Sequence, residues 1–357
     1  MADNKKKKRI AILTSGGDCS GLNAIIFGAI RCCEQRGYEL IGIINGTDGF
    51  ITGEHIILNR ESFPYSSINI AGSFLGSVLY KTLKSKGDLS WDGDRSSPVY
   101  PRLVEGIKKM GLDAVLFVGG NGSISWVENA PEIFTGVQVV FIPKTIDMDM
   151  PLTRNTVGFS TAISQLSLFI DGVAQSARSH RRWFVVEAMG RDSGHLALRG
   201  GMSGGADAII LPEIDVKMED LVKFVIDSGR EFGIVVVGEG SNLKSGDVAK
   251  AIEAAGIPTR KFSADYFQRG GITIAQDRLL AMRFAAAALD AVDNGETNVM
   301  VRVDDVGHMA TIGAQEFQES GIIAPDPNIP DRTVTYDVVH EDDQYLKAAR
   351  ELGIFLG

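Results

Sequence analysis

The sequence predicts an α/β protein with mainly parallel sheets, divided into two halves. Short apolar runs alternate with segments of helical spacing, which is the pattern of β–α–β units and therefore of parallel strands. Glycine-rich turns follow several of these runs, and the 41 glycines among 357 residues exceed the usual share of ~7%. A chain of 357 residues has the length of about two ordinary domains.

The first half opens with a β–loop–α–β unit. Residues 9–14 (RIAILT) are predicted to form a buried strand, residues 25–36 a helix and residues 38–44 the next strand. Two further apolar runs, residues 113–118 and 137–142, are predicted strands that end at glycine or proline. Because parallel strands share a carboxyl edge, the loops that follow them should meet there and form the ligand site.

The second half repeats this alternation. Strands are predicted at residues 183–187, 208–211 and 233–237, and helices at residues 191–202, 217–228, 247–255 and 275–293. The last helix is rich in alanine and is followed by Gly295, a usual residue at a helix end. We place the boundary between the two halves near residues 155–165.

Charge and cysteine content exclude several classes of function. Lys plus Arg number 36 and Asp plus Glu 45, so the formal net charge is −9, which disfavours a nucleic-acid partner or a membrane partner. No apolar run reaches the ~18 residues of a membrane helix, and the opening MADNKKKK lacks the apolar stretch of a signal peptide. Three cysteines make no disulfide framework, as expected of a cytoplasmic protein. Residues 1–8 are expected to be a disordered basic tip.

Two glycine-rich loops are candidates for phosphate binding, since backbone amides at glycines and helix N-termini bind anions. The candidate residues are Gly16 and Gly17 in TSGGD, and Gly120, Asn121, Gly122 and Ser123 in GGNGS. Each loop taken alone is also consistent with a tight turn. Two such loops on neighbouring strands would converge on one polyphosphate.

A third polar segment, PKTIDMD, follows the strand at residues 137–142. It holds Lys144, Asp147 and Asp149, and burying such charges at a strand end is costly without a function. One carboxylate could act as a base toward a hydroxyl while the other supports it or a metal. A solvated loop is the alternative.

A fourth, basic group consists of Arg182, Arg191, Arg260 and Arg269. Arginine suits bidentate phosphate recognition, although each of the four taken alone is more often part of a surface ion pair. Neither His180 nor His195 has a second ligand at metal spacing, so no zinc site is expected.

Five motifs together resemble the bacterial phosphofructokinase family of the A type. They are, in order, ILTSGGDCSGLNA, GGNGS, PKTIDMD, HRRWFVVEAMGRDSGH, and QRGG followed five residues later by DR. The resemblance runs from about residue 9 to residue 320. It implies a phosphofructokinase-type fold with two Rossmann-like, three-layer α/β domains. The implied donor-binding domain is residues 9–158 plus about 269–322, and the sugar-phosphate-binding domain is residues 159–268 plus about 323–357.

The resemblance also implies an activity. This is the glycolytic 6-phosphofructokinase reaction, in which ATP phosphorylates O1 of fructose 6-phosphate to give fructose 1,6-bisphosphate. Mg²⁺ is the implied cofactor, and a homotetramer or homodimer the implied assembly. Asp147 corresponds to the base toward the sugar 1-hydroxyl, Arg191 to the residue that stabilises the transition state, and Thr145 to a neighbour of the transferred phosphate.

The remaining roles carry over residue by residue. The implied substrate-binding residues are Thr145, Asp147, Asp149, Arg182, Met189, Gly190, Arg191, Glu239, Arg260, Tyr266 and Arg269. Among them, Arg182 corresponds to an arginine from a neighbouring subunit, and Tyr266 takes a position often held by histidine. The implied donor-binding residues are the two glycine-rich loops and Lys144, and the implied metal-binding residues are Asn121, Asp147 and Asp149.

Two positions bear on the phosphoryl donor. Gly122 resembles the ATP-using enzymes, whereas Lys144 resembles the pyrophosphate-using ones. Because lysine together with glycine also occurs in ATP-using branches, ATP is the predicted donor and pyrophosphate the alternative.

Three departures from the family pattern leave a second alternative. Asn121 replaces an acid that helps to hold the metal, Met148 stands where asparagine is usual, and Leu79 replaces an arginine of the enteric-type enzymes. A neutral amide binds Mg²⁺ more weakly than a carboxylate. The chain could therefore be a catalytically weak paralogue that binds sugar phosphate. A kinase of a related sugar phosphate is also left open.

Overall fold

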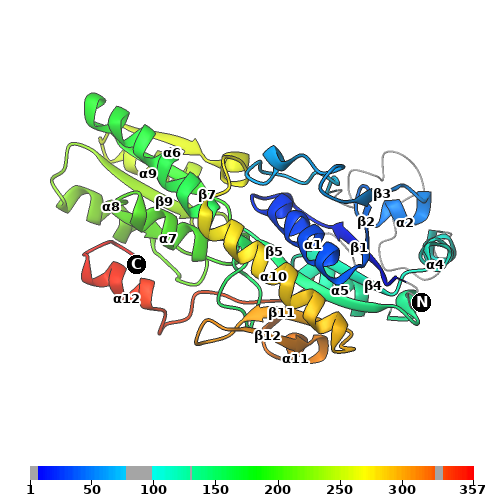
Figure 1. Cartoon of the computed structure of the whole chain (residues 1–357). Helices are drawn as coiled ribbons and strands as arrows, with labels where there is room; N and C mark the ends of the chain where they lie inside the picture. Colours follow the sequence, from blue (N-terminus) through cyan, green and yellow to red (C-terminus); the bar gives the residue numbers. More distant parts are fainter. Residues whose placement is uncertain (1–6, 78–98, 129–130, 326–332) are drawn as a thin grey trace, which may run out of the picture. The chain divides into compact units, whose positions relative to one another are not determined.

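The computed structural model describes residues 7–77, 99–128, 131–325 and 333–357 (Figure 1). The chain divides into two compact units. The first unit comprises Met1–Thr145, Met150–Gly158 and Ile272–Tyr336, and the second comprises Ile146–Asp149, Phe159–Gly271 and Asp337–Gly357. These bounds differ from those expected at two places. Residues 323–336 fall in the first unit, where β14 packs against α5, and Ile146–Asp149 falls in the second.

The first unit is built on one mixed sheet. Within the described residues its strand order is β12-β11-β5-β4-β1-β2-β3, and β6 pairs with β5. The strands are β1 (Arg9–Thr14), β2 (Glu39–Ile43), β3 (His55–Leu58), β4 (Ala114–Gly119), β5 (Gln138–Thr145), β6 (Val157–Gly158), β11 (Val299–Val303) and β12 (Met309–Gly313). The two edge strands β3 and β12 are antiparallel to their neighbours, and the other pairings are parallel.

Helices cover both faces of this sheet. They are α1 (Leu22–Arg36), α2 (Asp48–Thr52), η1 (Tyr65–Ser67), α4 (Val99–Met110), α5 (Asn121–Glu128), η3 (Pro131–Phe134), α10 (Ala275–Asp293) and α11 (Ala314–Glu319). Figure 1 shows α1 and α10 side by side along one face. A Cβ on Gly28 of α1 would lie 3.0 Å from that of Ala285 in α10. The small residue at position 28 thus permits close contact of the two helices. Separately, β13 (Ile322–Pro325) pairs antiparallel with β14 (Thr333–Tyr336).

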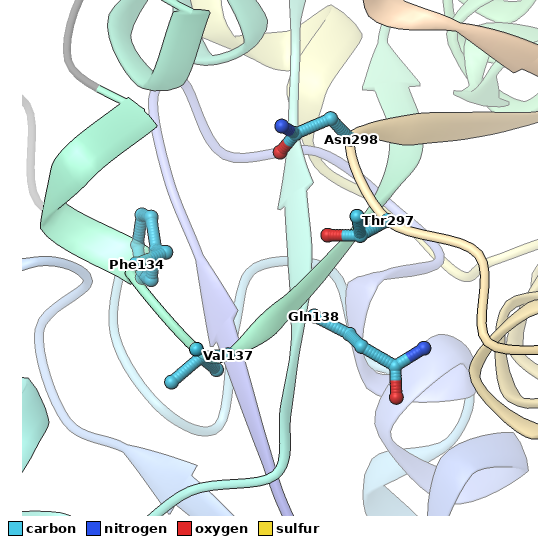
Figure 2. A pocket seen from close by; sticks show the side chains of 6 residues that line it. Phe134, Val137, Gln138, Thr297 and Asn298 are labelled. Carbon is cyan, nitrogen blue, oxygen red and sulfur yellow. The ribbon is translucent and has the colours of Figure 1, made fainter.

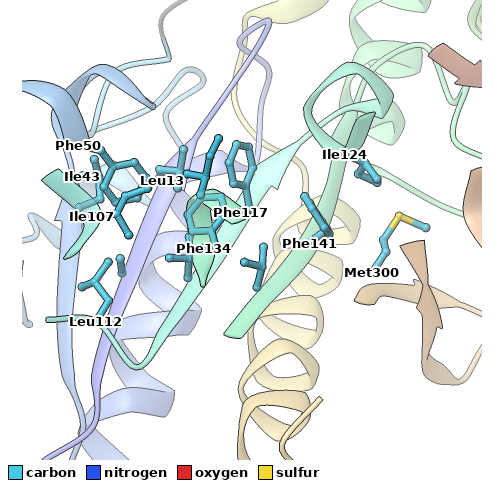
Figure 3. Packing of buried hydrophobic residues seen from close by; sticks show 14 of the residues in the cluster. Leu13, Ile43, Phe50, Ile107, Leu112, Phe117, Ile124, Phe134, Phe141 and Met300 are labelled. Carbon is cyan, nitrogen blue, oxygen red and sulfur yellow. The ribbon is translucent and has the colours of Figure 1, made fainter. Parts of the chain in front are cut away.

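The opposite face of the sheet holds a hydrophobic core rich in phenylalanine (Figure 3). The rings of Phe117 on β4 and Phe141 on β5 lie 5.7 Å apart, and Phe50 meets Phe134 edge to face at 6.2 Å. All six residues of β4 are buried, since both faces of the sheet are covered. This explains why β4 is a continuous apolar run rather than an alternating one.

The second unit has a smaller sheet in the order β10-β7-β9-β8, with every pairing parallel. Its strands are β7 (Trp183–Ala188), β8 (Ala208–Ile210), β9 (Gly233–Gly238) and β10 (Thr259–Ser263). Its helices are α6 (Phe159–His180), α7 (His195–Ser203), α8 (Met218–Asp227), α9 (Ser245–Ala254), η4 (Asp265–Arg269) and α12 (Gln344–Glu351). Side chains of α8 and α9 share a core with inward residues of β7, β8 and β9, while α6 and α7 pack together.

The predicted α/β fold with mainly parallel sheets is therefore confirmed. The helix predicted over residues 191–202 was wrong at its start, because α7 begins at His195. Gly190 has φ of +146° and Arg191 has φ of +52°, and neither value belongs to a right-handed helix. Of the predicted basic tip, residues 1–6 lie outside the described residues, as does Leu79. No helix in the described part of the chain is long and apolar enough to cross a membrane.

Candidate active site

The loop after β1 is held by a buried lysine. Lys144, the seventh residue of β5, is 3% exposed, and its Nζ donates to the carbonyl oxygens of Ser15 at 2.9 Å and Gly17 at 2.6 Å. Gly16 between them has φ of +79°, a left-handed conformation that favours glycine. Lys144 and the first glycine-rich loop, both predicted from the sequence, are thus in direct contact.

The second glycine-rich loop joins β4 to α5 and lies beside the first. The backbone N–H of Ser15 donates to the carbonyl of Val118 at 2.8 Å, which links the two loops. A Cβ on Gly119 would lie 2.3 Å from Oγ of Ser123, so only glycine fits there. The convergence expected of the two loops is therefore present, at the carboxyl edge of the first sheet.

Asn121 opens α5 and is 6% exposed. Its Oδ1 accepts a hydrogen bond from the backbone N–H of Gly122 at 2.6 Å. An asparagine oxygen can satisfy a backbone donor at a helix start in the same way as an aspartate oxygen. The substitution of an acid by Asn121 is therefore compatible with the local fold of the loop.

The segment Ile146–Asp149, which holds the predicted base, belongs to the second unit, whereas Thr145 is the last residue of β5 in the first unit. Asp147 is 6% exposed and Asp149 5% exposed, so both carboxylates lie in a poorly solvated environment. The intervening Met148 has φ of +55°. The solvated loop that was the alternative from sequence is excluded by this burial.

The Asp147 carboxylate faces Arg191. Oδ2 of Asp147 lies 4.0 Å from Nε of Arg191, which is an ion pair at long range, and the arginine side chain is 51% exposed. Arg191 follows Met189 and Gly190 in the loop after β7. The structure therefore brings together, within the second unit, an acid and an arginine that are 44 residues apart in sequence.

Glu239 joins this pair from the end of β9. Its Oε2 accepts from the backbone N–H of Arg191 at 3.2 Å, and its own N–H donates to the carbonyl of Ala188 at 2.9 Å. The next residue, Gly240, leaves no room for a side chain, because a Cβ there would lie 2.1 Å from the carbonyl oxygen of Arg191. Sequence reasoning missed Gly240, since no local pattern reveals a close approach of two loops.

Arg269 and Tyr266 lie on η4, which also supports the Met189 loop. The Arg269 guanidinium lies 5.8 Å from the centre of the Tyr266 ring, and Tyr266 is 74% exposed. Between them, buried Gln268 accepts from the backbone N–H of Met189 at 3.3 Å through Oε1. Gln268 was also missed, although its place in the QRGG motif was a signal.

Arg182 and Arg260 lie elsewhere. Arg182 precedes β7, and Arg260 is the second residue of β10, paired in register with Phe184. These are the amino-terminal ends of the two strands, whereas Arg191 and Glu239 follow the carboxyl ends of β7 and β9. Since β7 has six residues, the two ends are separated by roughly 17–20 Å of extended chain. Arg260 also pairs with Glu253 at 3.4 Å. The structure therefore does not bring these two arginines to Asp147 within one chain.

The first unit also has a surface pocket of about 320 Å³, at the opposite edge of its sheet (Figure 2). It is lined by Phe134, Gly136, Val137, Gln138, Thr297 and Asn298. These residues lie at or before the amino-terminal ends of β5 and β11, away from both glycine-rich loops. Ligands of parallel α/β sheets bind at the carboxyl ends, so we do not place the active site in this pocket.

Comparison with known proteins identifies the family of this chain. A family model described as phosphofructokinase matches residues 9–292. An ATP-dependent 6-phosphofructokinase 1 of Nostoc sp. is 31% identical, with 99% of both chains covered. The ATP-dependent 6-phosphofructokinase of Natranaerobius thermophilus is 35% identical over 84% of this chain and 90% of its own.

A solved structure extends the likeness to the fold. Phosphofructokinase from Saccharomyces cerevisiae matches with a TM-score of 0.77 and 25% identity, and the match covers 87% of this chain but 45% of the yeast chain. The matched family region contains both glycine-rich loops, the Asp147 segment and η4. The chain therefore belongs to the phosphofructokinase family.

Proposed function

We propose that this chain is an ATP-dependent 6-phosphofructokinase, which transfers the γ-phosphoryl group of ATP to O1 of fructose 6-phosphate. The observation that carries the proposal is the buried Asp147 carboxylate facing Arg191, with Glu239 bonded to the same loop. Relatives that match 99% and 84% of the chain bear the name of this activity. Product formation would yield fructose 1,6-bisphosphate and ADP.

The residues supply what this reaction needs. Phosphoryl transfer depends on positioning and charge neutralisation more than on covalent chemistry by the protein. Asp147 accepts the proton of the 1-hydroxyl as O1 bonds to the γ-phosphorus, and the bond from that phosphorus to the bridging oxygen of ADP breaks. Arg191 offsets negative charge on the phosphoryl oxygens, and Glu239 hydrogen-bonds sugar hydroxyls. The two glycine-rich loops present backbone amides to the donor phosphates.

The carboxylates present fit Mg²⁺. Within the described residues no group of three or more His, Cys, Asp or Glu side chains forms a metal cage. Mg²⁺ in kinases is usually held by one or two carboxylates together with substrate phosphates, and buried Asp147 and Asp149 provide that pair. Asn121 would contribute at most a neutral oxygen, which already accepts from Gly122. When bound, Mg²⁺ would neutralise charge on the transferred phosphate.

Gly122, rather than Lys144, supports ATP as the donor. In this chain Lys144 donates to two carbonyls of the first glycine-rich loop, so its presence is explained by loop structure as well as by donor chemistry. Position 122, which resembles the ATP-using enzymes, carries glycine. Pyrophosphate remains the second candidate donor, because an ammonium group lies directly beside the Gly16 turn.

The sugar 6-phosphate is bound by arginines from two subunits in this proposal. Arg269 and Tyr266 act in the subunit that carries the base, together with the Met189–Arg191 loop. Arg182 acts in the site of a neighbouring subunit, and Arg260 at the same end of the sheet acts with it. This requires a homodimer or homotetramer, and we place the reaction in the cytoplasm.

A coupled assay tests the proposal. Fructose 6-phosphate and Mg²⁺ are supplied with ATP, ADP or pyrophosphate in parallel, and fructose 1,6-bisphosphate is measured. Turnover with ATP alone is expected. Turnover with pyrophosphate alone would identify the chain as a pyrophosphate-dependent phosphofructokinase. Binding of fructose 6-phosphate without turnover by any donor would identify a sugar-phosphate-binding paralogue instead.

A further inference from the structure

The C-terminal segment Asp337–His340, which we call the strap, bonds to the loop of Asp147 directly and to the loop of Arg191 through Glu213. The backbone N–H of Asp337 donates to the carbonyl of Asp149 at 2.9 Å. Two residues on, the N–H of buried Val339 donates to Oε1 of Glu213 at 2.8 Å. All of these residues lie in the second unit.

Glu213 connects the strap to the loop of Arg191. The same Oε1 that accepts from Val339 accepts from the backbone N–H of Gly194 at 2.8 Å. Gly194 is three residues after Arg191, at the start of α7. One carboxylate oxygen therefore holds two backbone segments that are 145 residues apart in sequence, since 339 − 194 is 145.

The backbone at Gly194 packs closely against the Glu213 carboxylate. A Cβ on Gly194 would lie 2.4 Å from Oε2 of Glu213, so the loop approaches the carboxylate as closely as backbone can. Burial raises the pKa of Glu213 above its ordinary value. Two backbone donors to Oε1 offset part of this desolvation cost, while Oε2 is buried without a hydrogen-bond partner among the described residues.

The strap itself is ordered by short-range bonds. The Asp337 carboxylate accepts from the N–H of Val338 at 2.9 Å and lies 2.8 Å from Nε2 of His340. Further along, Arg199 of α7 faces the ring of Tyr345 at 4.3 Å and pairs with Asp343 at 3.8 Å. Asp343 also caps α12 by accepting from two backbone N–H groups. The strap is thus fastened on both sides of its contact with Glu213.

We propose that Glu213 and the strap are a positioning device for the reaction, which sets the separation of Asp147 and Arg191 through one continuous hydrogen-bonded path. The path runs from the Asp149 carbonyl through Asp337 and Val339 to Glu213, and from Glu213 to Gly194. Glu213 is a positioning residue and touches no reacting atom. The proposal rests on the proposed function for its catalytic consequence, but not for the coupling of the two loops.

Three variants test the path. Glu213→Ala removes the shared acceptor, and Glu213→Gln keeps an oxygen that accepts from both N–H groups. Asp207→Ala is the matched control, because the Asp207 carboxylate also accepts from a backbone N–H, that of Ile234 at 2.8 Å, and pairs with Arg230. These contacts join β8 to β9 and involve neither of the two loops. The expected result is a kcat at least tenfold lower for Glu213→Ala. We expect kcat within about threefold of wild type for Glu213→Gln and Asp207→Ala. KM for ATP should not change in any of the three.

Hydrogen exchange measures the coupling without activity. In Glu213→Ala, amides of residues 146–150 and 189–194 should both exchange faster, while Asp207→Ala leaves them unchanged. Faster exchange confined to residues 194 and 211–216 would overturn the proposal, as would an equal loss of kcat in Asp207→Ala. If Glu213→Ala does not fold, Asp337→Pro removes the backbone N–H that donates to Asp149 and leaves Glu213 in place. Amides of residues 146–150 that stay protected in Asp337→Pro would overturn the proposal. A wild type without turnover on fructose 6-phosphate would refute the proposed function, and the exchange result would still decide the coupling.

Discussion

Among single residues, Asp147 is the base in our proposed function. Its carboxylate is 6% exposed and faces a cationic group at 4.0 Å, which suits a base that must be ionised when substrate binds. Asp147→Asn keeps the shape of the side chain and removes the base. We expect kcat to fall by about 10²–10⁴, with KM for fructose 6-phosphate changed by less than threefold, in a steady-state assay. An unchanged kcat in a folded variant would remove Asp147 from the mechanism.

A second residue-scale prediction concerns Asp48 at the start of α2. It is 7% exposed, and burial raises its pKa from 3.8 to about 6. The unfolded chain ionises at the lower pKa, so native stability is lost as pH rises from about 4 to about 6 and stays lower above that. Asp48→Asn should therefore raise the melting temperature at pH 7 and leave it almost unchanged at pH 4. Equal effects at the two pH values, measured by thermal unfolding, would contradict the burial argument.

At the scale of elements, the loops after β7 and β9 pack backbone against backbone. A Cβ at Gly240 would lie 2.1 Å from the carbonyl oxygen of Arg191, so Gly240→Ala must displace the Arg191 loop. We expect kcat to fall at least tenfold. Gly246→Ala in α9 is the control, because nothing lies within 4 Å of a Cβ there, and alanine favours helix. Similar kinetics for the two variants would show that the close approach of Gly240 to the Arg191 carbonyl does not affect activity.

The core beneath the first sheet gives a prediction about stability. Phe117 on β4 is 1% exposed and packs against the ring of Phe141. Phe117→Ala removes buried apolar surface and leaves a cavity, which should lower the free energy of unfolding by about 3–5 kcal/mol. Ile57→Ala on edge strand β3, where the side chain is 53% exposed, should change it by less than ~0.5 kcal/mol. Urea unfolding at pH 7 measures both values, and equal losses would place Phe117 outside a cooperative core.

For the whole molecule, the position of Arg182 predicts shared sites. Arg182 precedes β7 at the end opposite to Arg191, so it serves a neighbouring subunit in our proposal. Asp147→Asn and Arg182→Ala should each be nearly inactive alone. The two variants are mixed in equal amounts, unfolded and refolded together. About half of the dimers then contain one chain of each kind, and each such dimer holds one intact site of two. The mixture should therefore regain about a quarter of wild-type activity. Activity that never exceeds the average of the two separate variants would show that each chain works by itself.

Much of the fold could be predicted, because local sequence patterns indicate where its strands and helices lie. Residues 9–14 and 275–293 were predicted with their observed bounds, since a strand buried on both faces leaves a continuous apolar run and an alanine-rich segment followed by glycine is typical of a helix and its end. The helix predicted from residue 191 failed because the positive φ of Arg191 is imposed by contacts with Glu239 and Gly240, which no local pattern contains.

The sequence by itself determined the α/β class, the parallel sheets, the two glycine-rich loops and the identity of the charged residues at strand ends. These follow from periodicity and from motifs of adjacent residues. Only the tertiary structure decided which of those charged residues meet. It placed Asp147 by Arg191, set Arg182 and Arg260 at the far end of their strands, and joined Asp149 and Gly194 through Asp337, Val339 and Glu213. The reason is physical, since such contacts depend on strand register and loop closure over more than 40 residues, which the chain acquires only when it packs.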